Sequence, residues 1–152
     1  MPSIKNAFRL SIGRHSEPGC IYLLTVVVDR RKPVFRDWRV GRLVVDQFKA
    51  AHEQQQVSSL AWVVMPDHFH WLLQSHDASL AELMCRVKSR SSLAVNAKLA
   101  RNGRLWQKGY HDRAVSREED LKAMARYVIA NPVRAGLVQR VGDYPLWDAT
   151  WL

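Results

Sequence analysis

Two apolar stretches separated by only two residues are the feature that most constrains the fold of this chain. Residues 57–65 read VSSLAWVVM and residues 68–74 read HFHWLLQ, with Pro66 and Asp67 between them. Proline followed by aspartate suits the centre of a type I turn. A connection this short can join only antiparallel neighbours. The sequence therefore predicts a β-hairpin with a tight turn, and a sheet built around it.

The flanking segments alternate between strand and helix patterns. Short β-branched and apolar runs predict strands at residues 20–29 and 105–115. Apolar residues at helical spacing predict an amphipathic helix over residues 38–56. Two capping boxes, Ser79-x-x-Glu82 and Ser116-x-x-Glu119, open further helices, which run to about Arg101 and to Asn131-Pro132.

The resulting order is strand, helix, strand, strand, helix, strand, helix. This order predicts a two-layer α+β domain, with an antiparallel sheet and helices packed on one face. With 152 residues, we expect one domain over residues 1–152. Residues 1–18 are expected to form a basic N-terminal arm, and about residues 139–152 an irregular C-terminal tail.

The charge balance indicates a polyanionic partner. The chain has 23 Lys and Arg against 14 Asp and Glu, a net charge of +9, and a pI near 10.1. Nucleic acid is the usual partner of so basic a domain, although basic residues can also serve solubility alone. No apolar run approaches the roughly 20 residues that span a bilayer, and no signal-peptide core is visible. The two cysteines are far apart, so we expect thiols, no thiolate zinc site and a cytoplasmic location.

The pair His68 and His70 is a candidate metal site. Side chains two apart on a strand point to the same face, about 7 Å apart. Two imidazoles on one face can bind a divalent cation if a third ligand comes from elsewhere. Two polar positions on a half-exposed strand would give the same pattern.

Tyr127 and Asn131 form a second candidate pair. They are four residues apart, so they lie on one face of the predicted last helix, about 6 Å apart. A tyrosine hydroxyl can act as a covalent nucleophile, and the Asn131 amide oxygen could complete a metal site. The spacing alone equally fits a tyrosine at the edge of the core and an asparagine that ends the helix.

Three segments in order resemble a known family. Residues 65–73, MPDHFHWLL, are similar to the His-hydrophobe-His (HUH) motif of bacterial single-tyrosine transposases. Residues 125–138, ARYVIANPVRAGLV, resemble the catalytic-tyrosine helix of their REP-associated branch, and residues 105–113, LWQKGYHDR, resemble a further block of it. The chain is therefore identified as similar to the REP-associated tyrosine transposases, which act on palindromic repeats in bacterial genomes.

The resemblance implies a ferredoxin-like α+β fold and a role for each matching residue. His68 and His70 match the metal-binding pair, and Tyr127 matches the nucleophile. Asn131 stands where related transposases carry a polar third ligand, often Gln. The implied cofactor is Mg²⁺ or Mn²⁺, and the implied reaction is cleavage and rejoining of single-stranded DNA through a 5′-phosphotyrosine link.

The implied partner is a DNA hairpin from a palindromic repeat with a short single-stranded guide sequence beside its foot. No acidic residue occurs from Arg86 to Arg104, so this stretch, with Lys88, predicts a surface that follows phosphates. The candidate DNA contacts are Arg30, Arg31, Lys32, Arg86, Arg90, Lys98, Arg101, Arg104, Arg113 and Arg134. Lys5, Arg9 and Arg14 of the arm add to them.

Other interpretations stay open at this point. The chain could be a hairpin-binding protein that kept the fold without catalysis, a metal hydrolase using water, or an RNA-binding protein. Monomer and homodimer are both compatible with the sequence. Among the tryptophans, Trp62 and Trp71 are expected in the core, whereas Trp147 and Trp151 either stack on bases or cover the site. Trp106 and His111 are either structural or line the site.

Overall fold

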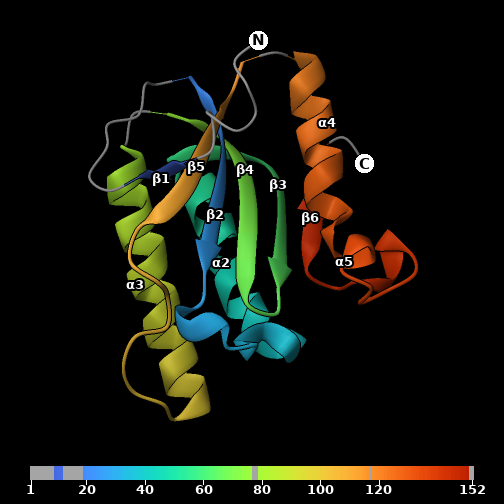
Figure 1. Ribbon diagram of the computed structural model, residues 1–152. Coiled ribbons are helices and arrows are strands. Elements are labelled where there is room, and N and C mark those ends of the chain that lie inside the picture. Colours follow the sequence, from blue (N-terminus) through green and yellow to red (C-terminus); the bar gives the residue numbers. More distant parts are fainter. Residues whose placement is uncertain (1–8, 12–18, 77–78, 117, 151–152) are drawn as a thin grey trace.

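The computed structural model describes residues 9–11, 19–76, 79–116 and 118–150 (Figure 1). Their central feature is a six-stranded sheet in the order β1-β5-β2-β4-β3-β6. Every pair of neighbours in this sheet is antiparallel. The strands are β1 (Arg9–Ser11), β2 (Ile21–Val27), β3 (Val57–Met65), β4 (His68–Ser75), β5 (Tyr110–Val115) and β6 (Trp147–Ala149).

The predicted hairpin is confirmed as the pair β3 and β4. Met65 lies opposite His68, so only Pro66 and Asp67 connect the two strands. A register shift between Ser59 and Ala61 marks an irregularity in β3. The hairpin lies inside the sheet, with β2 beside β4, and this arrangement buries its apolar side chains.

Two long helices cover one face of the sheet. They are α2 (Trp38–Glu53) and α3 (Leu80–Leu99), close to their predicted ranges. The predicted Ser79 cap is confirmed, since its hydroxyl accepts a hydrogen bond from the Glu82 backbone N–H at 3.1 Å. Val44, Phe48 and Met84 from these helices pack with strand residues in one apolar cluster.

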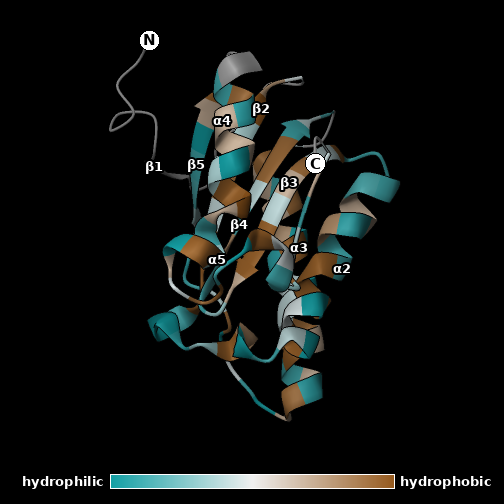
Figure 2. Cartoon of the chain, turned by 90° about the vertical axis from the view of Figure 1, so that its right-hand side faces the viewer, coloured by the Kyte–Doolittle hydropathy of each residue, from teal (hydrophilic) through white to brown (hydrophobic). Residues whose placement is uncertain are grey.

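The last helix covers the opposite face, so the prediction that the helices share one face is wrong for this element. It is α4 (Glu118–Ile129), and Figure 2 shows it across the sheet from α2 and α3. Its Val128 and Ile129 pack against Leu23, Val63 and Leu72. The next residues of the same strands, Leu24, Val64 and Leu73, face α2 and α3 instead. Consecutive apolar residues in the central strands therefore make two apolar faces, and each face needs a cover.

The C-terminal segment is not an irregular tail, which corrects the prediction for residues 139–152. After α4, the short helix α5 (Asn131–Arg134) turns the chain, and Trp147–Ala149 add β6 to the edge of the sheet beside β3. The Tyr144 hydroxyl donates to the Val64 carbonyl, and the buried Leu146 carbonyl accepts from the Val64 N–H. The segment is thus part of the fold through residue 150.

The strand predicted over residues 105–115 is shorter than expected. It begins at Tyr110, while Trp106 makes one isolated bridge to Val28. At the other edge of the sheet, Arg9–Ser11 of the predicted arm form β1 beside β5. The remaining residues of that arm lie outside the described part of the chain.

Candidate active site

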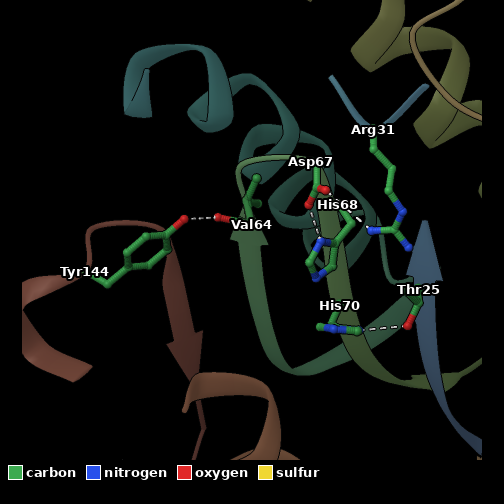
Figure 3. A network of polar contacts seen from close by, with 7 residues as sticks. All are labelled: Thr25, Arg31, Val64, Asp67, His68, His70 and Tyr144. Carbon is green, nitrogen blue, oxygen red and sulfur yellow. Dashed lines mark hydrogen bonds and ion pairs between the residues drawn. The ribbon is translucent and has the colours of Figure 1, made fainter. Parts of the chain in front are cut away.

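His68 and His70 lie on the α4 face of β4, next to the hairpin turn, which confirms that they share a face. They continue the row of Leu72, which packs under α4. Their ring centroids are 4.9 Å apart, and the rings are nearly perpendicular. His68 pairs with Val27 of β2 and His70 pairs with Thr25 (Figure 3).

Each imidazole is held through its Nδ1 atom. His68 Nδ1 lies 2.6 Å from Asp67 Oδ1, and His70 Nδ1 lies 2.7 Å from Thr25 Oγ1 (Figure 3). An ionised carboxylate only accepts, so His68 carries its proton on Nδ1; the Thr25 hydroxyl can accept from His70 in the same way. In that tautomer the Nε2 atom of each ring has a free lone pair, which is the form in which histidine binds metals.

Charge and burial favour this arrangement. Burial, together with the neighbouring charges of His68 and Arg134, lowers the pKa of His70 to about 3, so this ring is neutral near pH 7. Burial alone would raise the pKa of Asp67, but its hydrogen bond to His68 and the charges of His68 and Arg31 outweigh burial and lower it. The site therefore pairs a carboxylate acceptor with two imidazoles able to coordinate.

Tyr127 reaches this pair from α4. Its ring centroid is 6.2 Å from that of His70, and 47% of the residue is exposed. The helix is held by buried Val128 and Ala125 on its inner side. The phenol is therefore at the open edge of the helix, beside the histidines and within reach of solvent.

The Arg134 side chain packs against the Tyr127 ring. Its guanidinium carbon lies 4.0 Å from the Tyr127 ring centroid, a cation–π distance. One guanidinium nitrogen also donates to the Tyr127 carbonyl at 2.6 Å. The chain leaves helical α4 after Ile129, and Pro132 occupies the first turn of α5, where its missing N–H costs nothing. This turn places Arg134, seven residues after Tyr127, against the tyrosine ring.

Asn131 lies beside the same carbonyl. Its amide nitrogen is 3.3 Å from the Tyr127 carbonyl oxygen and 3.4 Å from that of Val128. Its amide oxygen is the atom of this side chain able to coordinate a cation. Among the described residues there is no group of three or more His, Cys, Asp or Glu side chains placed to hold a metal ion. The imidazole pair therefore fits two positions of a metal site, with oxygen ligands required for the rest.

Several of the predicted DNA contacts gather at the same end of the sheet. Arg30, Arg31 and Lys32 are exposed in the loop after β2, and Arg31 pairs with Asp67 at 3.4 Å. The loop after α3 returns to this end, since the Asp29 N–H donates to the Leu105 carbonyl. This loop contains Arg101 and Arg104, and Lys98 lies in the last turn of α3 just before it.

The other predicted contacts lie apart from this end. Arg86 and Arg90 occur in the middle of α3. Arg113 pairs with Leu23, so it lies on the α4 face, farther along the sheet than the histidines. Lys88 is not a free phosphate contact, because its ammonium donates to the carbonyls of Gln107 and Gly109 at 2.7 and 2.8 Å. It ties α3 to the following loop instead, and burial lowers its pKa.

The tryptophans mostly build the fold. Trp62 and Trp71 are buried, as predicted. Trp106 is also structural: it is buried and donates to the Ser91 hydroxyl at 2.9 Å. Trp147 packs at the edge of the core under α4 and donates to the Val141 carbonyl, so it is not a free stacking surface. Trp151 lies outside the described residues.

Sequence reasoning missed the two residues that orient the histidines. The sequence indicates only a turn role for Asp67, although this residue directly precedes His68. Thr25 carries a signal, since it is the one residue with an aliphatic hydroxyl in the apolar run YLLTVVV of residues 22–28. A buried polar residue in such a run needs a partner, and here the partner is His70.

No helix among the described residues has the length and apolarity that crossing a membrane requires. A pocket of about 240 Å³ lies between α2 and the edge formed by β3 and β6. None of its lining residues belongs to the site of His68, His70 and Tyr127.

Two similar proteins both carry the description of a REP-associated tyrosine transposase. The chain is 25% identical over 143 residues to a protein of Haemophilus influenzae described as a REP-associated tyrosine transposase, covering 84% of this chain and 78% of the relative. It is 30% identical over 87 residues to the REP-associated tyrosine transposase of Escherichia coli K12, covering 56% of this chain and half of that relative.

Two solved structures share the fold. A REP-associated tyrosine transposase bound to a REP hairpin superposes with a TM-score of 0.72 over 90% of this chain and 81% of its own, at 21% identity. A transposase from Deinococcus radiodurans superposes with a TM-score of 0.56 over 78% of this chain and 95% of its own, at 22% identity. These matches confirm the predicted α+β transposase fold.

The family model for IS200-like transposases matches residues 16–131, which include the histidine pair, Tyr127 and Asn131. Together with the two curated relatives, this match shows that the chain belongs to the IS200-like transposase family and resembles its REP-associated tyrosine transposases.

Proposed function

We propose that this protein is a metal-dependent transposase that cleaves and rejoins single-stranded DNA beside a palindromic-repeat hairpin. The observation that carries the proposal is the approach of Tyr127 from α4 to His70 on β4, at 6.2 Å between ring centroids. A candidate nucleophile and a candidate metal-binding pair come from elements far apart in sequence, yet they meet on one open face.

The residues present fit a divalent cation, Mg²⁺ or Mn²⁺. His68 and His70 would bind it through Nε2, because Asp67 and Thr25 occupy both Nδ1 atoms. Asn131 would offer an amide oxygen, and water or a DNA phosphate would supply the remaining oxygen ligands. When bound, the cation polarises the scissile phosphate and neutralises the charge that develops on it.

Tyr127 is the proposed nucleophile. Its phenolic oxygen attacks the phosphorus, the bond to the 3′-oxygen breaks, and the tyrosine becomes joined to the 5′-phosphate. The proton that the phenol loses is balanced by the one that the departing 3′-oxygen gains as a hydroxyl. A 3′-hydroxyl can later reverse the step, so one phosphodiester is exchanged for another and no nucleotide triphosphate is consumed.

Arg134 and the hairpin turn keep the reacting groups in place. The guanidinium packs on the Tyr127 ring and donates a hydrogen bond to the carbonyl of the same residue, so it restrains the tyrosine in the last turn of α4. Such positioning is worth a large share of a catalysed rate. Arg134 also leaves a positive charge beside the place where the phosphate would bind.

The proposed substrate is a DNA hairpin with a single-stranded guide sequence at its foot, in the cytoplasm of a bacterium. A similar fold has been solved with a REP hairpin bound. In this chain, the basic loop of Arg30, Arg31 and Lys32 adjoins Asp67 and the histidines. A strand entering the site would therefore pass exposed positive charge.

The test uses single-stranded hairpins from the host genome's palindromic repeats, labelled at the 5′ or the 3′ end. Each is incubated with protein and Mn²⁺ or Mg²⁺, with and without EDTA, and run on a denaturing protein gel. We expect a metal-dependent covalent band that carries the 3′ label only. Tyr127→Phe should abolish it, whereas Tyr144→Phe, which also removes one hydroxyl, should keep it. A shifted native complex without any covalent band would instead support the non-catalytic hairpin-binding function.

A further inference from the structure

Trp38, the first residue of α2, differs from the other described tryptophans in its exposure. It is 46% exposed, whereas Trp62, Trp71 and Trp106 are buried. An isolated exposed apolar side chain is common and needs no explanation by itself. The surroundings of this indole distinguish it.

Two arginines flank the Trp38 ring. The guanidinium carbons of Arg39 and Arg42 lie 5.8 and 5.6 Å from its centroid, within the range of cation–π attraction. Arg42 is one helical turn after Trp38, so the helix itself holds the two side chains together. The indole is thus kept on the surface with positive charge at its side.

The segment around the indole is strongly basic. From Asp29 to Arg42 there are six Lys and Arg residues and two acidic ones. All six basic side chains are exposed, while one acid, Asp37, accepts a hydrogen bond from the Arg39 N–H as the cap of α2. Exposed guanidinium groups interleaved with an aromatic ring suit a single-stranded nucleic acid, which has a phosphate and a base at each step.

This basic segment also adjoins the candidate active site. The Phe35 N–H donates to the carbonyl of Pro66 at 3.0 Å, and Arg31 pairs with Asp67, which holds His68 (Figure 3). Trp38 follows Phe35 by three residues. Figure 1 shows the N-terminal end of α2 at the same end of the sheet as the turn between β3 and β4. The histidines lie on the α4 face and α2 lies on the other face, so a strand that leaves the histidines would reach the indole by passing round the β3–β4 turn at this end of the sheet.

We propose that Trp38 stacks on an unpaired base of the single-stranded part of the DNA substrate, while Arg39 and Arg42 neutralise the adjoining phosphates. This inference rests on the proposed function for its partner, single-stranded DNA, and names a contact outside the chemical site. Because every base has an aromatic face, the contact adds affinity for an unpaired nucleotide without reading its identity.

The test measures binding in EDTA, where no cleavage occurs, by the fluorescence anisotropy of labelled oligonucleotides. One probe is a hairpin with a single-stranded flank, and the other is the same hairpin with a blunt end. Trp38→Ala should weaken binding of the flanked hairpin by a factor of about ten to a hundred, with Trp38→Phe between it and the wild type. Binding of the blunt hairpin should change less than about twofold, and the control Leu93→Ala, at an exposed α3 residue, should leave both unchanged.

An abasic scan locates the stacked base. At one position of the flank, removing the base should weaken wild-type binding as much as Trp38→Ala does, and should add nothing further in that variant. If Trp38→Ala bound the flanked hairpin as tightly as the wild type, or weakened both hairpins equally, the stacking role would be wrong. Should Trp38→Ala fail to fold, the abasic scan is repeated with Trp38→Phe, and the same comparison tests the stacking role.

The experiments distinguish a failure of the proposed catalytic function from a failure of the proposed stacking contact. A wild-type protein that forms no covalent band, yet shows the Trp38 effect in EDTA, would overturn the catalytic function alone. A wild-type protein that forms the band, with Trp38→Ala binding unchanged, would overturn the stacking contact alone.

Discussion

At the scale of single residues, the candidate site depends on neighbours that orient its histidines. The motif His68-Phe69-His70 was visible in the sequence, and the shared face of the two histidines followed from strand geometry. The role of Thr25 depends on the pairing of β2 with β4, a contact between residues 45 positions apart. Sequence patterns fix local geometry but not such pairings, so the orienting residue had to come from the structure.

Asp67→Asn tests the orienting role of the carboxylate. The amide keeps the shape but loses the charge that accepts from His68 Nδ1 and pairs with Arg31. We expect affinity for Mn²⁺ to fall about 10- to 100-fold, as is usual when such a supporting carboxylate is lost. Calorimetric titration of Mn²⁺ measures it. Asp143→Asn, which removes the exposed pair with Arg140, is the matched control; equal effects of the two changes would refute the orienting role.

Tyr144 gives a pH dependence with a definite sign. Burial raises its pKa to about 12, above the value near 10 of an unfolded chain. The folded state thus favours the neutral phenol, so its stabilisation is complete below about pH 10 and is lost as the pH rises toward 12.

Tyr144→Phe removes both this pH dependence and the hydrogen bond to the Val64 carbonyl. Near pH 8 the variant should be less stable than the wild type by about 1 kcal/mol. The difference should shrink between pH 10 and 12, which urea unfolding at a series of pH values would show. A difference that stays constant to pH 12 would contradict the assignment.

At the scale of elements, the sequence predicted the strands and helices well but not which faces they cover. Turn residues and capping boxes are local signals, and they placed the hairpin, α2 and α3 near their observed limits. The position of α4 depends on the apolar residues of both sheet faces, which no single helix reveals. The edge strand β6 has only three residues and exists because β3 offers a partner, so no strand pattern announces it.

Gly41 of α2 tests how the C-terminal segment docks. A methyl group added there would meet the Leu146 side chain, which is buried at the end of the chain. In an open helix, Gly→Ala would stabilise by about 1 kcal/mol. Here we expect Gly41→Ala to destabilise the protein by about 1–3 kcal/mol, because the buried Leu146 side chain would have to shift from its packed position.

The matching experiment is a double-mutant cycle with Leu146→Ala. That change alone should cost about 2–5 kcal/mol of unfolding free energy, and the two losses together should be smaller than their sum by about 1 kcal/mol or more. Urea unfolding of the four proteins measures the coupling. Additive losses would mean that a methyl group at position 41 does not contact the Leu146 side chain.

At the scale of the whole molecule, positive charge gathers at one end of the sheet. The loop after β2 and the loop after α3 both reach the end where His68 starts β4. Arg31 of the first loop pairs with Asp67 beside the candidate site, and the composition of the chain alone could not place it there. Such an arrangement would guide a polyanion toward the site and make binding depend on salt.

Paired charge removals test this asymmetry. Arg30→Gln with Lys32→Gln should weaken hairpin binding and reduce the slope of log affinity against log salt by about 1–2. Lys49→Gln with Lys122→Gln removes the same charge near the far ends of α2 and α4, and should leave that slope nearly unchanged. Anisotropy titrations at several salt concentrations measure these slopes. Equal slopes for the two double variants would refute a localised binding surface.

The proposed function requires that Tyr127 becomes joined to the 5′-phosphate of cleaved DNA. The most direct measurement is mass spectrometry of the wild-type protein after reaction with a hairpin and Mn²⁺, nuclease trimming and trypsin digestion. Trypsin cuts after Arg126 and Arg134, so the peptide YVIANPVR carries Tyr127 as its one hydroxyl side chain. We expect a nucleotide mass on this peptide, attached at the tyrosine and absent when EDTA replaces the metal. A nucleotide on any other peptide, or cleaved DNA with no peptide attached, would contradict it.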